Sequence, residues 1–226
     1  MILGRPWIAG TIFYSAEGQE TKLSRVRLVH SQFLWGRKVD LAYEAGARSV
    51  CENSLAMLMR ELKRDELELF WTIDRREVLH NIYVMRDGET VLTPYYFDVP
   101  GWKNTNSEKL YACFDRGGTI LGMFDGDQLV GSSAVDTVPR GANGDLLELR
   151  HLHVSRDYRG TGVGTRLFDA AKDIVRERGA PAMYVSATPT ENTVKFYLHR
   201  GCRLAVPPDP EALDLEPDDI HLVCDV

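Results

Sequence analysis

From about residue 60 onward, the order of hydrophobic and polar positions becomes regular and predicts strands alternating with helices. Apolar residues recur at helical spacing from residue 163, and Gly179 and Pro181 end that helix. The predicted strands cover residues 78–84, 91–96, 119–124, 129–137, 146–154, 182–187, 202–206 and 220–225, and the other predicted helices cover residues 65–71, 107–114 and 191–200. This order indicates an α/β fold of the α+β, mixed-sheet type around one central sheet.

The strand over residues 146–154 carries more polar chemistry than the others. Strict alternation assigns Leu147, Leu149, His151 and His153 to one face, and Leu146, Glu148, Arg150, Leu152 and Val154 to the other. Neither face is wholly polar, so we expect both to be covered by other elements.

Composition narrows the class of protein. The 226 residues are 44% hydrophobic and carry a net charge of −6, which suits a globular domain with or without a short extension and argues against a protein that coats nucleic acid. Residues 1–56 hold seven basic and five acidic side chains, whereas residues 57–226 hold 20 and 28. The first segment therefore has a separate character, either as an added subdomain or as an extension upstream of a start at Met57 or Met59.

The cysteines and the first residues bear on the compartment. Cys51, Cys113, Cys202 and Cys224 form no CxxC pair, so we expect four reduced thiols. No run approaches the roughly 20 apolar residues of a membrane span, and the first residues lack the basic region of a secretion signal. A cytoplasmic protein that binds neither membrane nor nucleic acid is expected.

A glycine-rich loop between the strand at 146–154 and the helix at 163 predicts an anion site. Gly160, Gly162 and Gly164 allow the backbone to approach a ligand, and the N-terminus of the following helix adds a partial positive charge. Arg156 and Arg159 flank the loop.

Two nucleotide-binding patterns do not match this loop. A dinucleotide fingerprint needs a sixth-position glycine where Thr165 stands, and a Walker A loop needs a Gly-Lys step that is absent. A glycine turn with a purely structural role is the remaining alternative from the loop alone.

Two sequence blocks together resemble the Gcn5-related N-acetyltransferase (GNAT) superfamily. The run Arg159-Gly160-Thr161-Gly162-Val163-Gly164 resembles the acetyl-CoA-binding signature, and residues 191–202 resemble the later block of Asn, a helix with Phe-Tyr, and Gly-Phe, with Cys202 in place of the usual Phe. The resemblance covers roughly residues 61–226, so we assign residues 57–226 to the acetyltransferase domain and leave residues 1–56 as an extension of unknown order and role. It implies a central, mostly antiparallel sheet with a splayed parallel strand pair, flanked by helices.

The resemblance implies a site for acetyl-CoA as co-substrate, with no metal. The pantetheine arm would pair with backbone groups of Leu152 and Val154 in the gap between the splayed strands. The pyrophosphate would be bound by the loop and the helix start, through Arg159, Gly160, Thr161, Gly162, Val163, Gly164 and Thr165. Asn192 would contact the cofactor arm, although an Asn at a helix start also serves as a cap.

Direct attack of an amine on the thioester, in a ternary complex, requires a base and an acid. An amine of pKa about 10.4 is almost fully protonated at pH 7, so a base must remove its proton. By position, the resemblance gives this role to Glu148 and the acid role to Tyr197. A salt bridge to Arg150 or another strand neighbour is the alternative for Glu148, and a packed core aromatic is the alternative for Tyr197. His151 and His153 are alternative bases, expected on the face opposite Glu148.

The acceptor is expected to be an amine of a small molecule or peptide. A cationic antibiotic and a polyamine are candidates, because the stretch that would bind the acceptor is rich in aromatic residues and the surface is acidic. These aromatic residues are Trp71, His80, Tyr83, Tyr95, Tyr96 and Trp102, and a place in the core is the alternative for each. The acidic loop over residues 209–219 is expected to be solvated rather than to clamp a substrate. A homodimer is compatible with the sequence, and a non-catalytic acyl-CoA sensor of the same fold is the alternative function.

Overall fold

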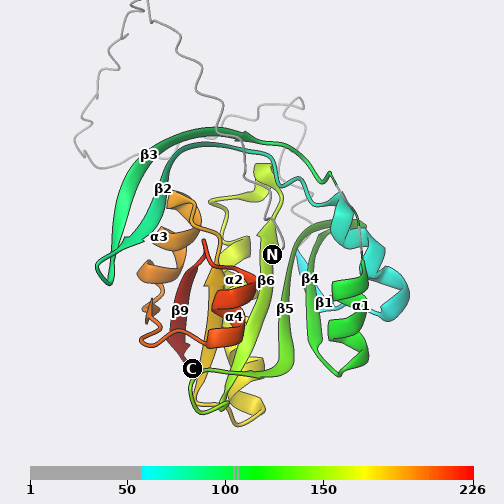
Figure 1. The fold of residues 1–226 in the computed structure, drawn as a ribbon. Coiled ribbons are helices and arrows are strands. Elements are labelled where there is room, and N and C mark those ends of the chain that lie inside the picture. Colours follow the sequence, from blue (N-terminus) through cyan, green and yellow to red (C-terminus); the bar gives the residue numbers. More distant parts are fainter. Residues whose placement is uncertain (1–56, 104, 106) are drawn as a thin grey trace, which may run out of the picture. The chain divides into compact units, whose positions relative to one another are not determined.

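The computed structural model describes residues 57–103, 105 and 107–226, and a seven-stranded sheet is the centre of this part (Figure 1). Its strands are β1 (Leu58–Glu61), β4 (Thr119–Asp125), β5 (Gln128–Arg140), β6 (Leu146–Val154), β7 (Ala182–Ala187), β8 (Arg203–Leu204) and β9 (Ile220–Asp225). The order across the sheet is β1-β4-β5-β6-β7-β9-β8, and only the β6–β7 pair is parallel. The predicted mixed α/β fold, mostly antiparallel with one parallel pair, is confirmed. The expectations for residues 1–56 lie outside the described residues.

Helices cover both faces of this sheet, as its mixed strand pattern predicts. The helices are η1 (Arg64–Thr72), α1 (Glu108–Asp115), η2 (Arg156–Tyr158), α2 (Val163–Glu177), α3 (Glu191–His199) and α4 (Pro210–Leu215). Helices α2 and α3 pack on β6, β7 and β9 through a core that includes Phe168, Val175 and Val194. Helices η1 and α1 pack on β4 and β5 through Phe70 and Leu110. Helix α4 lies within the segment that the sequence analysis predicted to be an open acidic loop, so that prediction was wrong over residues 210–215.

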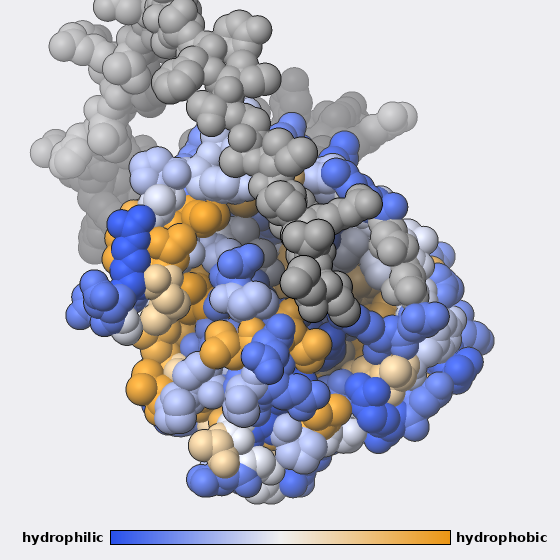
Figure 2. All heavy atoms as spheres, viewed as in Figure 1, coloured by the Kyte–Doolittle hydropathy of each residue, from blue (hydrophilic) through white to orange (hydrophobic). Residues whose placement is uncertain are grey.

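A separate hairpin of β2 (Glu77–Arg86) and β3 (Glu89–Val99) arches over one end of the sheet (Figure 1). Its turn places Asp87 and Gly88 at positive φ, 51° and 82°, as a two-residue hairpin loop requires. One attachment to the main body is a 2.7 Å hydrogen bond from the Tyr83 amide to the Pro189 carbonyl. Hydrophobic side chains gather along this hairpin in Figure 2, and several are exposed, including Met85.

A β-bulge in β6 overturns the predicted alternation of its side chains. Along the β5–β6 pair, Ala134 faces His151 and Val135 faces Leu149, so Arg150 is an extra residue. Before the bulge Leu149 lies in the core under α2 and α3, and after it Leu152 packs on the same core.

His151 and His153 consequently lie on the opposite face from that core, against Phe70. This is the face of Glu148, whereas the sequence analysis placed the two histidines on the face opposite Glu148. That prediction was wrong because the bulge shifts the alternation by one residue.

The cysteines also differ from expectation. Cys202 and Cys224 form a disulfide between the start of β8 and β9, and only Cys113 is a free cysteine among the described residues. The expectation of reduced thiols was therefore wrong for Cys202 and Cys224. The two residues lie far apart in sequence but meet because Arg203 pairs with Val223 across antiparallel strands. Cys51 lies outside the described residues.

Candidate active site

Strands β6 and β7 separate soon after they pair, and this separation opens a large cavity. Their register consists of Leu147 opposite Met183 and Glu148 opposite Tyr184. Beyond these pairs lies a cavity of about 1350 Å³, lined by the second half of β6, the glycine loop, α3 and the β2–β3 hairpin. The predicted pantetheine-contact residues Leu152 and Val154 both line it.

The glycine loop closes one end of the cavity with backbone rather than with side chains. Gly160 and Gly162 adopt positive φ, 77° and 92°, and a Cβ added at either would meet nothing within 4 Å. Gly162 caps α2, and the amide of Arg166 donates to its carbonyl at 3.0 Å. The amides of the first turn, which precede Arg166, have no carbonyl of their own helix to bond, so the helix start is suited to an anion.

The other predicted loop residues differ in their exposure to the cavity. Gly164 and Thr165 line it, as do Gly160 and Gly162. Val163 is 1% exposed and packs in the core, and the hydroxyl of Thr161 donates to Tyr158 O at 2.7 Å. Neither Thr161 nor Val163 lines the cavity, so their side chains are directed to the protein rather than to a ligand.

Arg159 ties the loop to the segment before β2. Its Nε donates to Val154 O at 3.2 Å, one terminal nitrogen donates to Arg75 O at 3.2 Å, and the other lies 3.5 Å from Glu77 Oε2. Arg75 lines the same end of the cavity, and its pKa is lowered by burial and then by the charge of Arg159. Two guanidinium groups therefore gather at the glycine-loop end.

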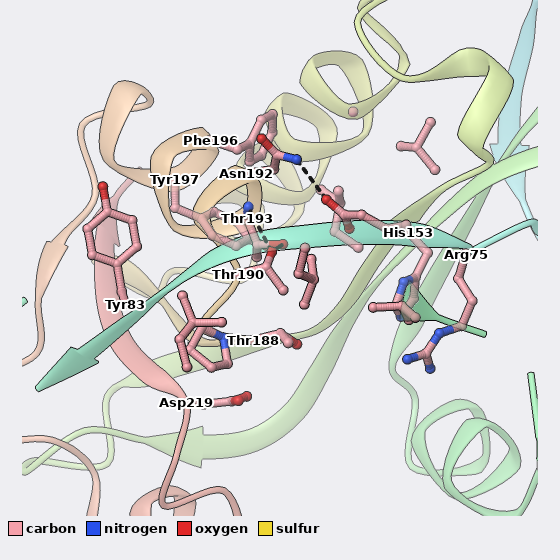
Figure 3. A pocket seen from close by; sticks show the side chains of 18 of the residues that line it. Arg75, Tyr83, His153, Thr188, Thr190, Asn192, Thr193, Phe196, Tyr197 and Asp219 are labelled. Carbon is pink, nitrogen blue, oxygen red and sulfur yellow. Dashed lines mark hydrogen bonds between the residues drawn. The ribbon is translucent and has the colours of Figure 1, made fainter. Parts of the chain in front are cut away.

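Asn192 lines the cavity but does not cap its helix. Its side-chain amide donates to Glu77 Oε1 at 2.7 Å, which links α3 to the hairpin (Figure 3). The cap of α3 is Thr190, whose hydroxyl accepts from the Thr193 amide at 3.3 Å. Sequence reasoning missed Thr190, which also lines the cavity and is 7% exposed. The sequence signal for this cap was a Thr directly before the predicted helix start, three residues before Thr193.

Tyr197 lies on α3 with its side chain 5% exposed, at the wall of the cavity. Burial raises the pKa of its phenol, and the charge of Asp219 raises it further. The hydroxyl makes no hydrogen bond to the described residues, yet no fully buried side-chain polar atom among them lacks a partner. The hydroxyl therefore opens onto the cavity as a neutral proton donor.

Glu148 is held in an ion-pair cluster and does not line the cavity. It is 3% exposed, and its two oxygens accept from Arg140 Nε and Arg150 Nη1, each at 2.8 Å. Arg140 also lies 3.0 Å from Glu211 and 3.6 Å from Asp209. The salt bridge that sequence analysis gave as the alternative for Glu148 is present in the structure.

His151 and His153 are packed among aromatic side chains between β6 and η1. His151 hydrogen-bonds Ser132 Oγ at 3.0 Å, and burial lowers its pKa well below the usual value. Burial also lowers the pKa of His153 to about 4, with the charges of Arg75 and Arg159 adding to the shift. Both rings are therefore neutral at pH 7, and of the two only His153 lines the cavity.

Sequence reasoning also missed Asp218 and Asp219, which line the cavity directly before β9. The expectation that the whole acidic loop is a solvated surface was wrong at Asp209, which is 6% exposed, whereas Asp218 is exposed and Asp219 is half-buried. Of the aromatic residues named as acceptor contacts, Tyr83 and Tyr95 line the cavity, whereas Trp71 and Trp102 pack against Phe70. The sequence signal for Asp218 and Asp219 was their position directly before the last predicted strand.

Comparison with known proteins gives one family. A family model described as the acetyltransferase (GNAT) family matches residues 64–202. No curated protein sequence matches the chain.

Solved structures give the same fold at low sequence identity. A nourseothricin acetyltransferase is 16% identical with a TM-score of 0.57, covering 75% of this chain and 98% of its own. A putative streptothricin acetyltransferase from Bacillus anthracis, in complex with acetyl coenzyme A, is 19% identical with a TM-score of 0.52, covering 77% and 99%. The PaiA N-acetyltransferase from Thermoplasma acidophilum, in complex with coenzyme A, is 17% identical with a TM-score of 0.52, covering 76% and 100%.

Each helix in the described part of the chain is too short or too polar to span a membrane. Over the same residues, His, Cys, Asp and Glu side chains form no group of three or more that could hold a metal ion.

Proposed function

Because the chain belongs to the GNAT family of acyl-CoA-dependent N-acetyltransferases, we propose that it transfers the acetyl group of acetyl-CoA to a primary amine of a small molecule or peptide. The observation that carries this proposal is the cavity beyond the point where β6 and β7 separate, with a glycine loop at one end and Tyr197 at its wall. The two similar structures that contain acetyl coenzyme A or coenzyme A support the choice of co-substrate.

The residues of the positive end fit the phosphates of acetyl-CoA. The amides of Gly162, Val163 and Gly164 would face the pyrophosphate, because the first turn of a helix leaves its N–H groups without partners. Arg159 and Arg75 add positive charge at the same end. Hydrogen bonds to a charged group contribute about 1.5–3 kcal/mol each, so a few such amides would hold a pyrophosphate without a lysine.

Backbone and side chains farther along the cavity fit the rest of the co-substrate. Leu152 and Val154 lie where β6 has left β7, so their backbone groups are the candidates to pair with the pantetheine arm. Asn192 would contact this arm only if its side chain exchanged the present hydrogen bond to Glu77.

We assign Tyr197 the role of proton donor to the departing thiolate. Its raised pKa keeps the phenol protonated at neutral pH, and its hydroxyl has no competing hydrogen bond to the described residues. The role of Glu148 as general base stays a prediction. For Glu148 to act as a base, its carboxylate would have to give up contacts to Arg140 or Arg150.

The acceptor is best described as a small amine. The names of the nourseothricin and streptothricin acetyltransferases support a small-molecule acceptor over a protein, and the cavity is large enough for such a molecule beside the co-substrate arm. The alternative of a peptide amine stays open to the assay below.

The test is thiol release from acetyl-CoA with a panel of spermidine, 2-phenylethylamine, a streptothricin-class antibiotic and a lysine peptide. We expect Tyr197→Phe to lower kcat by about 100-fold, within the usual contribution of a general acid, without weakening acetyl-CoA binding. Tyr111→Phe, on α1 and outside the cavity, is the matched control and should leave kcat unchanged. Unchanged kcat in Tyr197→Phe would remove Tyr197 from the mechanism, and no turnover of any amine would contradict the transferase proposal.

A further inference from the structure

The two ends of the cavity differ in charge. Arg75 and Arg159 are the cationic side chains among its described lining residues, and both lie at the end of the glycine loop. Asp218 and Asp219 line it elsewhere, and Figure 3 shows Asp219 and Arg75 far apart along the cavity. The phosphates of the co-substrate and a cationic acceptor would thus be attracted to different ends.

Asp219 has a carboxylate that no described residue neutralises. It precedes the first residue of β9, Ile220, which pairs with Ala187, and its amide donates to Glu216 O at 3.1 Å. The backbone is therefore fixed, while the half-buried carboxylate makes no ion pair or hydrogen bond within the described part of the chain. Burial raises its pKa to about 6, and the charges of Glu216 and Asp218 contribute to the shift.

Tyr197 supplies an independent indication that a polar ligand belongs beside Asp219. Its hydroxyl is on a side chain that is 95% buried by area, has no hydrogen-bond partner among the described residues, and opens onto the cavity. The charge of Asp219 contributes to its pKa shift, so the two groups lie within electrostatic reach of each other. The proton donor assigned above and an unneutralised carboxylate therefore line the same cavity.

We infer that Asp219 binds the ammonium group of the acceptor and takes its proton, in the cavity that Tyr197 also lines. This inference rests on the proposed acetyl transfer and adds the residue that receives the acceptor. Glu148 is the contrasting acid, because its two oxygens already accept from Arg140 and Arg150. A base must have a free lone pair, and the carboxylate of Asp219, which lines the cavity without a partner among the described residues, has one.

The proton transfers of the reaction balance with these two groups. Asp219 takes one proton from the ammonium and releases it to solvent, leaving a neutral amine. The amine nitrogen forms a bond to the thioester carbonyl carbon, and the carbon–sulfur bond breaks. Tyr197 gives its proton to the leaving sulfur and regains one from the nitrogen, so that the products are an amide, a thiol and one released proton.

The cavity wall formed by the β2–β3 hairpin indicates the chemistry of the acceptor beyond its ammonium group. Apolar and aromatic side chains of β2 and β3 line the cavity, namely Leu79, Ile82, Tyr83, Val84, Met85, Tyr95, Phe97 and Val99. An amine with an apolar or aromatic body would bury surface against this wall while its ammonium contacts Asp219. An amine that also carries a carboxylate would be repelled by Asp218 and Asp219.

The test compares Asp219→Asn with Asp214→Asn, which removes an exposed acid of α4 outside the cavity. With the best amine of the panel above, we expect Asp219→Asn to lower kcat/KM at pH 7 by about 100-fold or more, in the usual range for a general base. The wild-type profile should rise with pH through about 6 as Asp219 loses its proton, and the variant should lack this limb. The groups that face Asp219 are Glu216 and Asp218 of its own segment and Tyr197 of α3.

Three measurements separate the outcomes. Acetyl-CoA affinity by calorimetry should be the same in wild type and Asp219→Asn, which shows that the variant folds. If Asp219→Asn does not fold, Asp219→Ser takes its place, and Asp219→Glu should recover part of the activity in either case. A wild-type pH profile and kcat/KM retained in Asp219→Asn or Asp219→Ser would overturn the inference, whereas wild-type protein inactive toward every amine would overturn the proposed function instead.

Discussion

Two acids, Glu148 on β6 and Asp219 directly before β9, have contrasting surroundings. Glu148, near the start of β6, is 3% exposed and accepts from two guanidinium groups at 2.8 Å. Asp219 is half-buried at the cavity wall, and no cation among the described residues pairs with it. The nearest charges that act on Asp219 are those of other acids.

The difference shows how local pairing decides what a buried acid does. A buried carboxylate that has two cationic partners holds elements together, and removing one partner is costly. A carboxylate that is desolvated without a partner has a raised pKa and a free lone pair, which are the properties of a proton acceptor at neutral pH. Spacing in the sequence points to Glu148 as the general base, whereas the surroundings in the structure favour Asp219 for this role.

The largest effect that would test this contrast is the loss of Arg140. Arg140→Met leaves Glu148 with Arg150 as its one partner, so we expect the free energy of unfolding to fall by about 3–5 kcal/mol, the usual cost of breaking a buried pair. Urea unfolding measures this. Arg64→Met, which removes an exposed pair with Asp115, is the control and should change the unfolding free energy little. Equal stability of the two variants would show that the Glu148 cluster is not structural.

The next effect concerns the positive end of the cavity. Gly162→Glu places a carboxylate beside the amides of the α2 N-terminus, so we expect acetyl-CoA affinity to fall by about 100-fold, which is about 2.7 kcal/mol. Calorimetry measures the affinity. Gly126→Glu is the matched control, because Gly126 also has positive φ and open space but lies in the β4–β5 turn. An unchanged affinity in Gly162→Glu would mean that the loop does not hold the phosphates.

The smallest effect concerns His153, which lies on β6 as Glu148 does and, like Asp219, lines the cavity. His153 has its pKa lowered to about 4, chiefly by burial, so the unfolded chain binds this proton more tightly. Stability from His153 is therefore complete above pH 6.5 and is lost as the pH falls toward 4.

Between pH 7 and pH 5, His153→Gln should reduce the fall in unfolding free energy by about 1–2 kcal/mol. Urea unfolding at both pH values gives this difference, with His80→Gln on the exposed side of the hairpin as control. The same pH dependence in wild type and His153→Gln would show that the ring is not buried in its neutral form.

Most elements of the sheet were predictable because they have a local signature, whereas β1 (Leu58–Glu61) was not predicted. The strand over Leu146–Val154 and the strand over Ala182–Ala187 were predicted with the bounds that the structure shows, since turn residues flank both. The glycine loop was equally clear, because positive φ at Gly160 and Gly162 is a local demand of the backbone.

The features that were not predicted depend on contacts between distant segments. The disulfide of Cys202 and Cys224 requires that β8 and β9 be neighbours, which spacing alone does not show. The pairing of Glu148 with Arg140 depends on the register of β5 and β6. Asp219 was not identified because its proposed role depends on Tyr197, which lies on α3 and is 22 residues earlier in the sequence.

Because Arg150 is an extra residue, the side chains of β6 that face α2 and α3 are odd-numbered before it and even-numbered after it. Upstream of it, even-numbered side chains point away from α2 and α3, and downstream odd-numbered ones do. Transferring a functional position from one acetyltransferase to another by counting back from the glycine loop therefore yields the right strand but the wrong side whenever one of the two chains lacks this residue. Deleting Arg150 would turn the whole segment from Leu146 to Leu149 over, exchanging a buried ion-pair cluster for a core position under α2.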